Sequence, residues 1–143
     1  MSAAAVAVPY RTTRVMTARE VEGYPVALET GAARGSEVVV VGANIHTDDA
    51  LARANGLGGR VADGMIVGNW LYQAAVAVLG PQMLELGQFR VKFIRPVYVG
   101  DEIELVVDAP ADRSGGVALR AEVLGEVRVV GAAMIGPAEG APR

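Results

Sequence analysis

His46 is the single histidine of this chain, and it lies in a short polar segment that also contains Asn44. An apolar run from Glu37 to Ala43 precedes this segment, and a predicted helix start follows it. Imidazole is the side chain best suited to proton transfer near neutral pH, so His46 is the first candidate for a general base. Its position in a loop before a helix favours a site. The competing interpretation is a structural imidazole that donates to a backbone carbonyl.

A second group of candidates surrounds the start of the longest apolar segment, Met65 to Leu79. A helix N-terminus offers unpaired N–H groups and a positive dipole end, which stabilise a developing oxyanion. Gly64 has no Cβ and would let a ligand approach that backbone closely. Asp63 could bring a carboxylate into the same site, or it could simply cap the helix. Asn44 could fix the tautomer of His46, hold a substrate oxygen, or turn its own backbone.

Two helices are predicted to position these groups. A buried helix over 64–79 is expected to begin after the Asp63 cap and to end at Gly80-Pro81. A shorter helix, capped by Thr47 or Asp48, is expected to end at Gly56. The candidate base would then precede the short helix, and the candidate oxyanion donor would open the long one.

The remaining pattern predicts strands. Near the N-terminus, Thr17 could cap a helix, but Gly23 and Pro25 are expected to stop it early, which leaves an early strand. Strands are expected over 26–28, 37–43, 89–93, 103–107, 117–123 and 127–135. One nearly all-apolar helix followed by antiparallel strands is an α+β signature, and such a helix needs cover all round. We therefore expect an antiparallel sheet wrapped around a long apolar central helix.

Composition limits the class of protein. The 143 residues fit a single domain over 1–143, with loose termini at about 1–9 and 137–143. Hydrophobic residues make up 52%, the net charge is −3, and there is no cysteine, so no thiol nucleophile or cysteine-ligated zinc is expected. No basic run suggests nucleic acid, and no metal site is predicted. The longest apolar run is short for a membrane span, and the N-terminus lacks the features of a signal peptide, so a cytoplasmic location is expected.

Two separated sequence motifs follow one another along the chain. The first comprises His46, Asp48, Ala52, Gly56, Val61-Ala62 and Gly64-Met65, and the second runs from Phe93 through Pro96-Val97 to Gly100-Asp101. Together they resemble the MaoC-like, (R)-specific enoyl thioester hydratase and dehydratase family of hot-dog folds. The second motif is similar to the family's F-x-x-P-V-x-x-G-D strand and turn. The resemblance implies a hot-dog domain that forms a homodimer, with active sites at the interface.

The resemblance also implies roles for individual residues. His46 would be the family base, and the backbone N–H of Gly64 would bind the thioester carbonyl. The family's catalytic Asp falls five residues before His46, where this chain has Val41. A valine cannot accept a proton or polarise water, so Val41 would only contact substrate, and Asp63 is the candidate replacement carboxylate. The substrate would be carried on coenzyme A or on the phosphopantetheine of an acyl carrier protein, with no other cofactor.

Several functions follow from these residues. The first is a hydro-lyase acting on a β-hydroxyacyl or enoyl thioester. The missing carboxylate leaves open an isomerase, epimerase or conjugate-addition cyclase in a specialised polyketide pathway, or a thioesterase in which Asp63 activates water. A catalytically silent acyl-binding subunit is the alternative outside enzymes. Arg90, Lys92 and Arg95 could meet phosphates of the carrier, or could form a solvated sheet face.

Overall fold

The computed structural model describes residues 7–31, 44–110 and 115–136, and for residues 25–31 it describes the backbone only. The predicted strand over 37–43, with Val41, lies outside these residues, as do most of the termini predicted to be loose. The elements, in chain order, are β1 (Tyr10–Val15), α1 (Ala18–Gly31), α2 (Asp49–Ala54), α3 (Gly64–Leu79), α4 (Met83–Leu86), β2 (Gly87–Phe93), β3 (Glu102–Asp108), β4 (Val117–Val123) and β5 (Glu126–Ile135).

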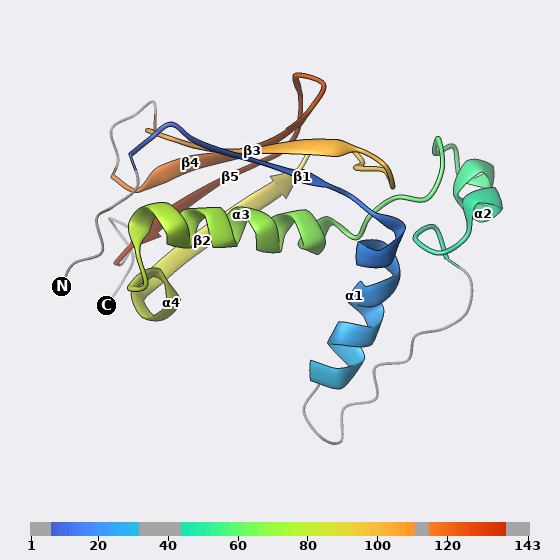
Figure 1. Ribbon diagram of the computed structural model, residues 1–143, viewed down its shortest axis with the longest axis horizontal. Helices are drawn as coiled ribbons and strands as arrows, with labels where there is room; N and C mark the ends of the chain where they lie inside the picture. The colour runs from blue at the N-terminus through green and yellow to red at the C-terminus, as the bar shows by residue number, and fades with distance from the viewer. Residues whose placement is uncertain (1–6, 32–43, 111–114, 137–143) are drawn as a thin grey trace.

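The five strands form one antiparallel sheet in the order β1-β3-β4-β5-β2. The central helix α3 lies along one face of this sheet, and α1 and α2 lie at the end where α3 begins (Figure 1). Strand β4 alternates as predicted, and the inward residues of β3 and β4, such as Leu105 and Leu119, are buried in the core with α3. In β3 the alternation is incomplete, because Val106 on the opposite face is buried as well. The sheet therefore wraps the helix that the sequence predicted it to cover.

The bounds of α3 agree with the prediction because both ends carry strong signals. The Asp63 side chain accepts a hydrogen bond from the Met65 N–H at 2.9 Å, which caps the first turn. Gly80 ends the helix with a φ of +90°, a conformation that favours glycine. Leu71 and Ala75 of α3 are fully buried in the core. The 16 residues of α3 are thus held at both ends and along one side.

The prediction for residues 17 to 28 was wrong. Helix α1 continues through Gly23 and Pro25, so the backbone of 26–28 is helical and no strand forms there. Thr17 caps the helix by accepting from the Glu20 N–H at 3.1 Å. A proline inside a helix removes one N–H donor and crowds the carbonyl four residues earlier, at a cost of about 3 kcal/mol, but it can kink a helix without ending it. The cap and the burial of Val21 at 2% exposure therefore sustain the helix that the sequence pattern ended.

Two elements, β1 and α4, were not predicted from the sequence. Strand β1 is polar, with Arg and Thr at four of its six positions, and its place at the sheet edge follows from pairing with β3. Helix α4 has only four residues and leads directly into β2. Within the described residues, no helix is both long and apolar enough to cross a membrane.

Candidate active site at the start of the central helix

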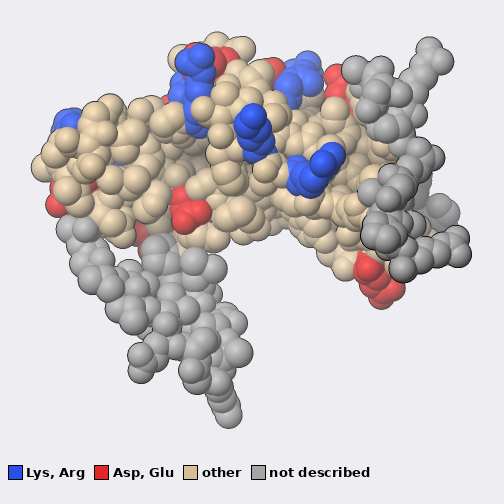
Figure 2. All heavy atoms as spheres, turned by 180° about the vertical axis from the view of Figure 1, so that it is seen from behind, with Lys and Arg blue, Asp and Glu red and all other residues tan. Residues whose placement is uncertain are grey.

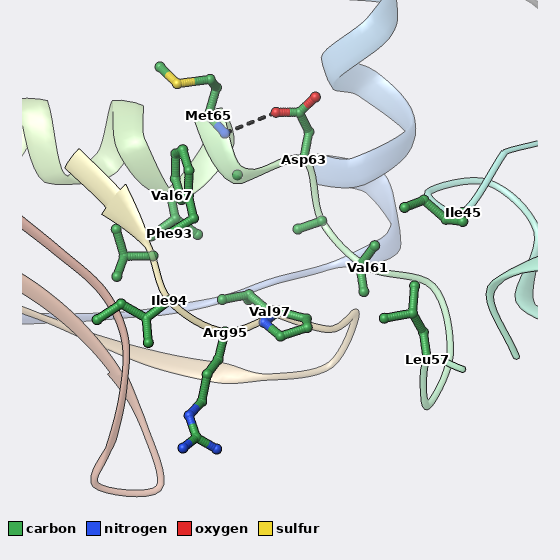
Figure 3. Close-up of a pocket in the computed structure, with 14 residues that line it drawn as sticks. Ile45, Leu57, Val61, Asp63, Met65, Val67, Phe93, Ile94, Arg95 and Val97 are labelled. Carbon is green, nitrogen blue, oxygen red and sulfur yellow. Dashed lines mark hydrogen bonds between the residues drawn. The ribbon is translucent and has the colours of Figure 1, made fainter. Parts of the chain in front are cut away.

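An apolar cavity of about 430 Å³ lies beside the first turn of α3. Its walls come from that turn, from the loop before it, and from the segment that follows β2 (Figure 3). The apolar side chains that the close-up labels around it include Ile45, Leu57, Val61, Phe93, Ile94 and Val97. Arg95 and Asp63 are the charged residues among the described lining. A cavity of this size and lining suits a largely hydrocarbon ligand.

Backbone hydrogen bonds fix the loop before α3 between the other two walls. The Val61 N–H donates to the Ile45 carbonyl at 3.2 Å, and the Ala62 N–H donates to the Val97 carbonyl at 2.8 Å. Val61 also forms an isolated antiparallel bridge with Tyr98. These bonds bring the histidine loop, the start of α3 and the Pro96-Val97 segment of the second motif to one place.

Gly64 supplies an N–H group that no acceptor among the described residues takes up. The Asp63 carboxylate binds the next N–H, at Met65, and the Asp63 carbonyl accepts from Ile66 at 3.0 Å. A Cβ at Gly64 would lie 2.9 Å from Cε1 of Phe93, so the ring of Phe93 packs directly on this glycine. The N–H of Gly64, a residue of the cavity lining, thus has no partner within the described parts of the chain.

Asp63 serves as the helix cap in this structure. In Figure 3 its carboxylate points back toward the Met65 N–H and away from Leu57 and Val97. Burial, and next the negative charge of Asp63, raise the pKa of Tyr24 above its usual range. Asp63 therefore acts on one residue of α1, Tyr24, as well as on the Met65 N–H of α3. Its predicted role as a catalytic carboxylate stays a prediction.

His46 is half-buried, and its ring Nδ1 lies 2.8 Å from the Val61 carbonyl oxygen. A carbonyl can only accept, so in the neutral ring Nδ1 carries the proton and Nε2 is the basic nitrogen. Among the described residues, the cavity lining includes Ile45 and Val61 but not His46. The imidazole is therefore hydrogen-bonded to the backbone of Val61, a residue that lines the cavity. This contact is the one that the competing interpretation of His46 expected, a donation to a backbone carbonyl, although the sequence did not identify Val61 as the partner. The catalytic role of His46 stays a prediction.

Asn44 shapes the loop that carries His46. Its side-chain Oδ1 accepts from the His46 N–H at 2.8 Å, and its carbonyl accepts from the N–H groups of Thr47 and Asp48. This is the backbone-turning interpretation, and the tautomer of His46 is set by Val61 instead. A substrate contact by Asn44 stays a prediction.

The other carboxylates near His46 have structural partners. Asp48 caps α2 by accepting from the Leu51 N–H at 3.0 Å. Asp49 accepts from the Arg60 N–H at 2.9 Å, which ties α2 to the loop before α3. Asp63 is consequently the one carboxylate among the described residues of the cavity lining. No group of three or more potential metal ligands occurs within the described parts of the chain.

Comparison with known proteins places this arrangement in a family. A family model described as a MaoC like domain matches residues 43–129, whereas no curated protein matches the sequence. The chain is similar to the unliganded R-hydratase PhaJ1 of Pseudomonas aeruginosa, with 23% identity over 94% of this chain and 84% of that chain and a TM-score of 0.59. The chain is also similar to the (R)-hydratase of A. caviae involved in PHA biosynthesis, with 22% identity over 94% of this chain and 100% of that chain and a TM-score of 0.52.

A further similar structure is the ChsH1-ChsH2 complex of Mycobacterium tuberculosis, with 13% identity over 94% of this chain and 99% of that chain and a TM-score of 0.66. At these identities, the structural similarities show the fold, an antiparallel sheet wrapped around a central helix. The family model covers more than half of the sequence and includes His46, Gly64 and Pro96. The chain therefore belongs to the MaoC-like domain family and has its hot-dog fold.

Proposed function

We propose that this protein is a hydro-lyase that adds water to, or removes it from, an acyl thioester. The observation that carries the proposal is the N–H of Gly64, which has no acceptor among the described residues, opens a helix and borders an apolar cavity. An enolate oxygen formed from a thioester needs such a donor, and the cavity suits the hydrocarbon part of the acyl group. The (R)-hydratases among the similar structures carry out a reaction of this class by name.

The chemistry requires one base and one oxyanion donor. In dehydration, Nε2 of His46 would take the proton from the α-carbon while the Gly64 N–H and the α3 dipole stabilise the enolate oxygen. The enolate would then expel hydroxide from the β-carbon, and the imidazolium would return its proton to form water. Hydration is the reverse. His46 alone balances the protons, so the reaction does not require a carboxylate at Val41.

Three residues act in support of this scheme. Asp63 holds the first turn of α3 in place through its bond to Met65. Asn44 shapes the loop that presents His46. Val41 would contact the substrate where the family has its Asp. The carrier would be coenzyme A or an acyl carrier protein, and the protein would work in the cytoplasm, where such thioesters are made.

We propose that the active unit is a homodimer joined through β2. In the described part of the chain, β2 pairs only with β5, so its other side is an open sheet edge. Phe93 and Ile94, at the end of β2, are 45% and 49% exposed, and Leu86 just before it is 58% exposed. Pairing two copies would bury this apolar surface beside the cavity. An assembly of two different hot-dog chains is the alternative that the ChsH1-ChsH2 complex illustrates.

A second candidate is an isomerase or cyclase that uses the same enolate. The observation in its favour is that Asp63, the one carboxylate in the described lining, is engaged as a helix cap. An enolate can be reprotonated at another carbon, or can close a ring, without any activated water. Such reactions would need His46 and Gly64 but no second acid.

The test is a mass-spectrometric assay on trans-2-enoyl and (R)-3-hydroxyacyl thioesters, in which a gain or loss of water is measured for wild type and His46→Asn. Asparagine places its Nδ2 where Nδ1 of histidine lies, so it retains the donor to Val61 and removes the base. We expect water gain or loss to fall by about a hundredfold or more in the variant. No water exchange by wild type, with the α-proton exchanging, would support the isomerase. Full activity in His46→Asn would contradict the role of His46.

A further inference from the structure

The outer face of β2 carries two exposed cations, Arg90 and Lys92. Along this strand Phe89 and Val91 pack toward the core, so the alternate residues point away from α3. Across the sheet, Arg90 is paired with Ala132 and Lys92 with Val130, both uncharged. Figure 2 shows blue side chains spaced along a mostly uncharged face of the molecule. The two cations are therefore neighbours on one flat, exposed surface.

Other arginines on this side of the sheet are neutralised within the chain. The ion pairs are Arg11–Glu104, Arg120 with Glu122 and Asp108, Arg128–Glu126 and Arg95–Glu126. No carboxylate among the described residues pairs with Arg90 or Lys92. In a protein of net charge −3, an uncompensated pair of cations marks a surface suited to an anionic partner.

This surface leads to the mouth of the cavity. Arg95 lines the cavity, is 58% exposed, and shares Glu126 with Arg128, at 3.3 Å and 3.0 Å respectively. Because Glu126 would keep Arg128 as a partner, Arg95 can be released to another anion at little electrostatic cost. From Arg90 to Arg95 the chain spans at most about 17 Å of extended backbone. We call Arg90, Lys92 and Arg95 the basic row.

We propose that the basic row is the docking surface for an acidic acyl carrier protein whose prosthetic arm enters the cavity at Arg95. This inference rests on the proposed function. Residues two apart on a strand are about 7 Å apart, and carboxylates four apart on a helix are about 6 Å apart, so an acidic helix can pair with both Arg90 and Lys92. Most of the row lies along the strand outside the cavity, where a protein surface fits better than a single small carrier molecule. Three cations are too few for a nucleic-acid site, which needs a longer positively charged groove.

The test compares one acyl group on three carriers: trans-2-hexenoyl on acyl carrier protein, on coenzyme A, and on pantetheine, which has no phosphate. The variant is Arg90→Glu/Lys92→Glu, and Arg19→Glu/Arg53→Glu is a control with the same charge change at exposed arginines elsewhere. We expect kcat/KM for the carrier-protein substrate to fall about tenfold or more in the first variant only, with pantetheine turnover unchanged. Added salt should weaken the wild-type preference for the carrier protein.

Two results would overturn the proposal. One is an equal fall in kcat/KM for all three substrates in Arg90→Glu/Lys92→Glu, or an equal fall for the carrier-protein substrate in both double variants. The other is a selective loss with coenzyme A, which would assign the row to the phosphates of that molecule. Direct binding of holo carrier protein, measured by calorimetry with both double variants, separates docking from catalysis. If no thioester turns over but the carrier protein binds through Arg90 and Lys92, the docking surface stands and the hydro-lyase proposal fails.

Discussion

At the scale of single residues, the contact between Gly64 and Phe93 determines what the helix start can accept. A Cβ at Gly64 would lie 2.9 Å from the ring, whereas a Cβ at Gly68, one turn later, would meet its nearest atom at 3.4 Å. We expect Gly64→Ala to displace the Phe93 ring and to lower thioester turnover about tenfold or more. Gly68→Ala is the matched control and should raise helix stability by up to about 1 kcal/mol. Equal turnover in both variants would show that the Gly64 backbone is not used.

Val41 is the second residue at which the function can be tested. Val41→Asp restores the carboxylate that the family has five residues before the histidine. If the protein is a hydro-lyase that uses His46 alone, the added acid should raise the hydration rate by about tenfold or more. Val40→Asp is the control, since it adds the same charge one position away. A hydration rate unchanged by Val41→Asp would instead favour the isomerase or cyclase.

At the scale of elements, the Asp63 cap of α3 joins stability to function. Removing the cap in Asp63→Ala should cost about 1 kcal/mol and lower the melting temperature by about 3 °C. Turnover should fall as well, because the first turn positions the Gly64 donor. Asp63→Asn keeps an acceptor for the Met65 N–H and should preserve both quantities. If Asp63→Asn stays stable but loses turnover, the carboxylate takes part in the chemistry.

The helices and strands also show which parts of the fold could be predicted from the sequence. The bounds of α3 were predictable because a capping Asp63 and the Gly80-Pro81 pair stand at its two ends. Strand β1 was not predictable, because its polar residues show no strand pattern and adopt a strand only by pairing with β3. The helix end predicted at Pro25 was wrong, since the signal for ending a helix is local, whereas the burial of Val21 that sustains α1 depends on the core.

The candidate site was predictable only in part, because local spacing identifies residues but not their tertiary contacts. Spacing indicated His46 and Gly64, both of which lie near or at the cavity. The pairing of His46 with the Val61 carbonyl is a contact between residues fifteen apart, and the Phe93 ring on Gly64 joins two elements. Such contacts come from tertiary packing, so no local pattern reveals them.

At the scale of the whole molecule, the open edge of β2 predicts a dimer joined through this strand. Its mass in solution at micromolar concentration should be about twice the 14.8 kDa of the chain. The alternation set by the Ile94 N–H bond to Arg128 leaves the Val91 N–H on the open edge, so Val91→Pro should shift the dimer toward monomer. Thr13→Pro makes the same change on the β1 edge and should leave the dimer intact. A monomeric mass for the wild type, measured by light scattering, would contradict the proposed dimer.

The position of the acyl site can be measured by a nuclear magnetic resonance titration of the ¹⁵N-labelled protein with trans-2-hexenoyl pantetheine. If the acyl group binds at the start of α3, the Gly64 amide should show one of the largest shifts, with further changes at Val61 and Phe93 around the cavity. The contradicting result would be an unchanged Gly64 amide, with shifts confined to the groove between α1 and α3 that Asn69 and Gln73 line. That outcome would move the acyl site away from the start of the central helix.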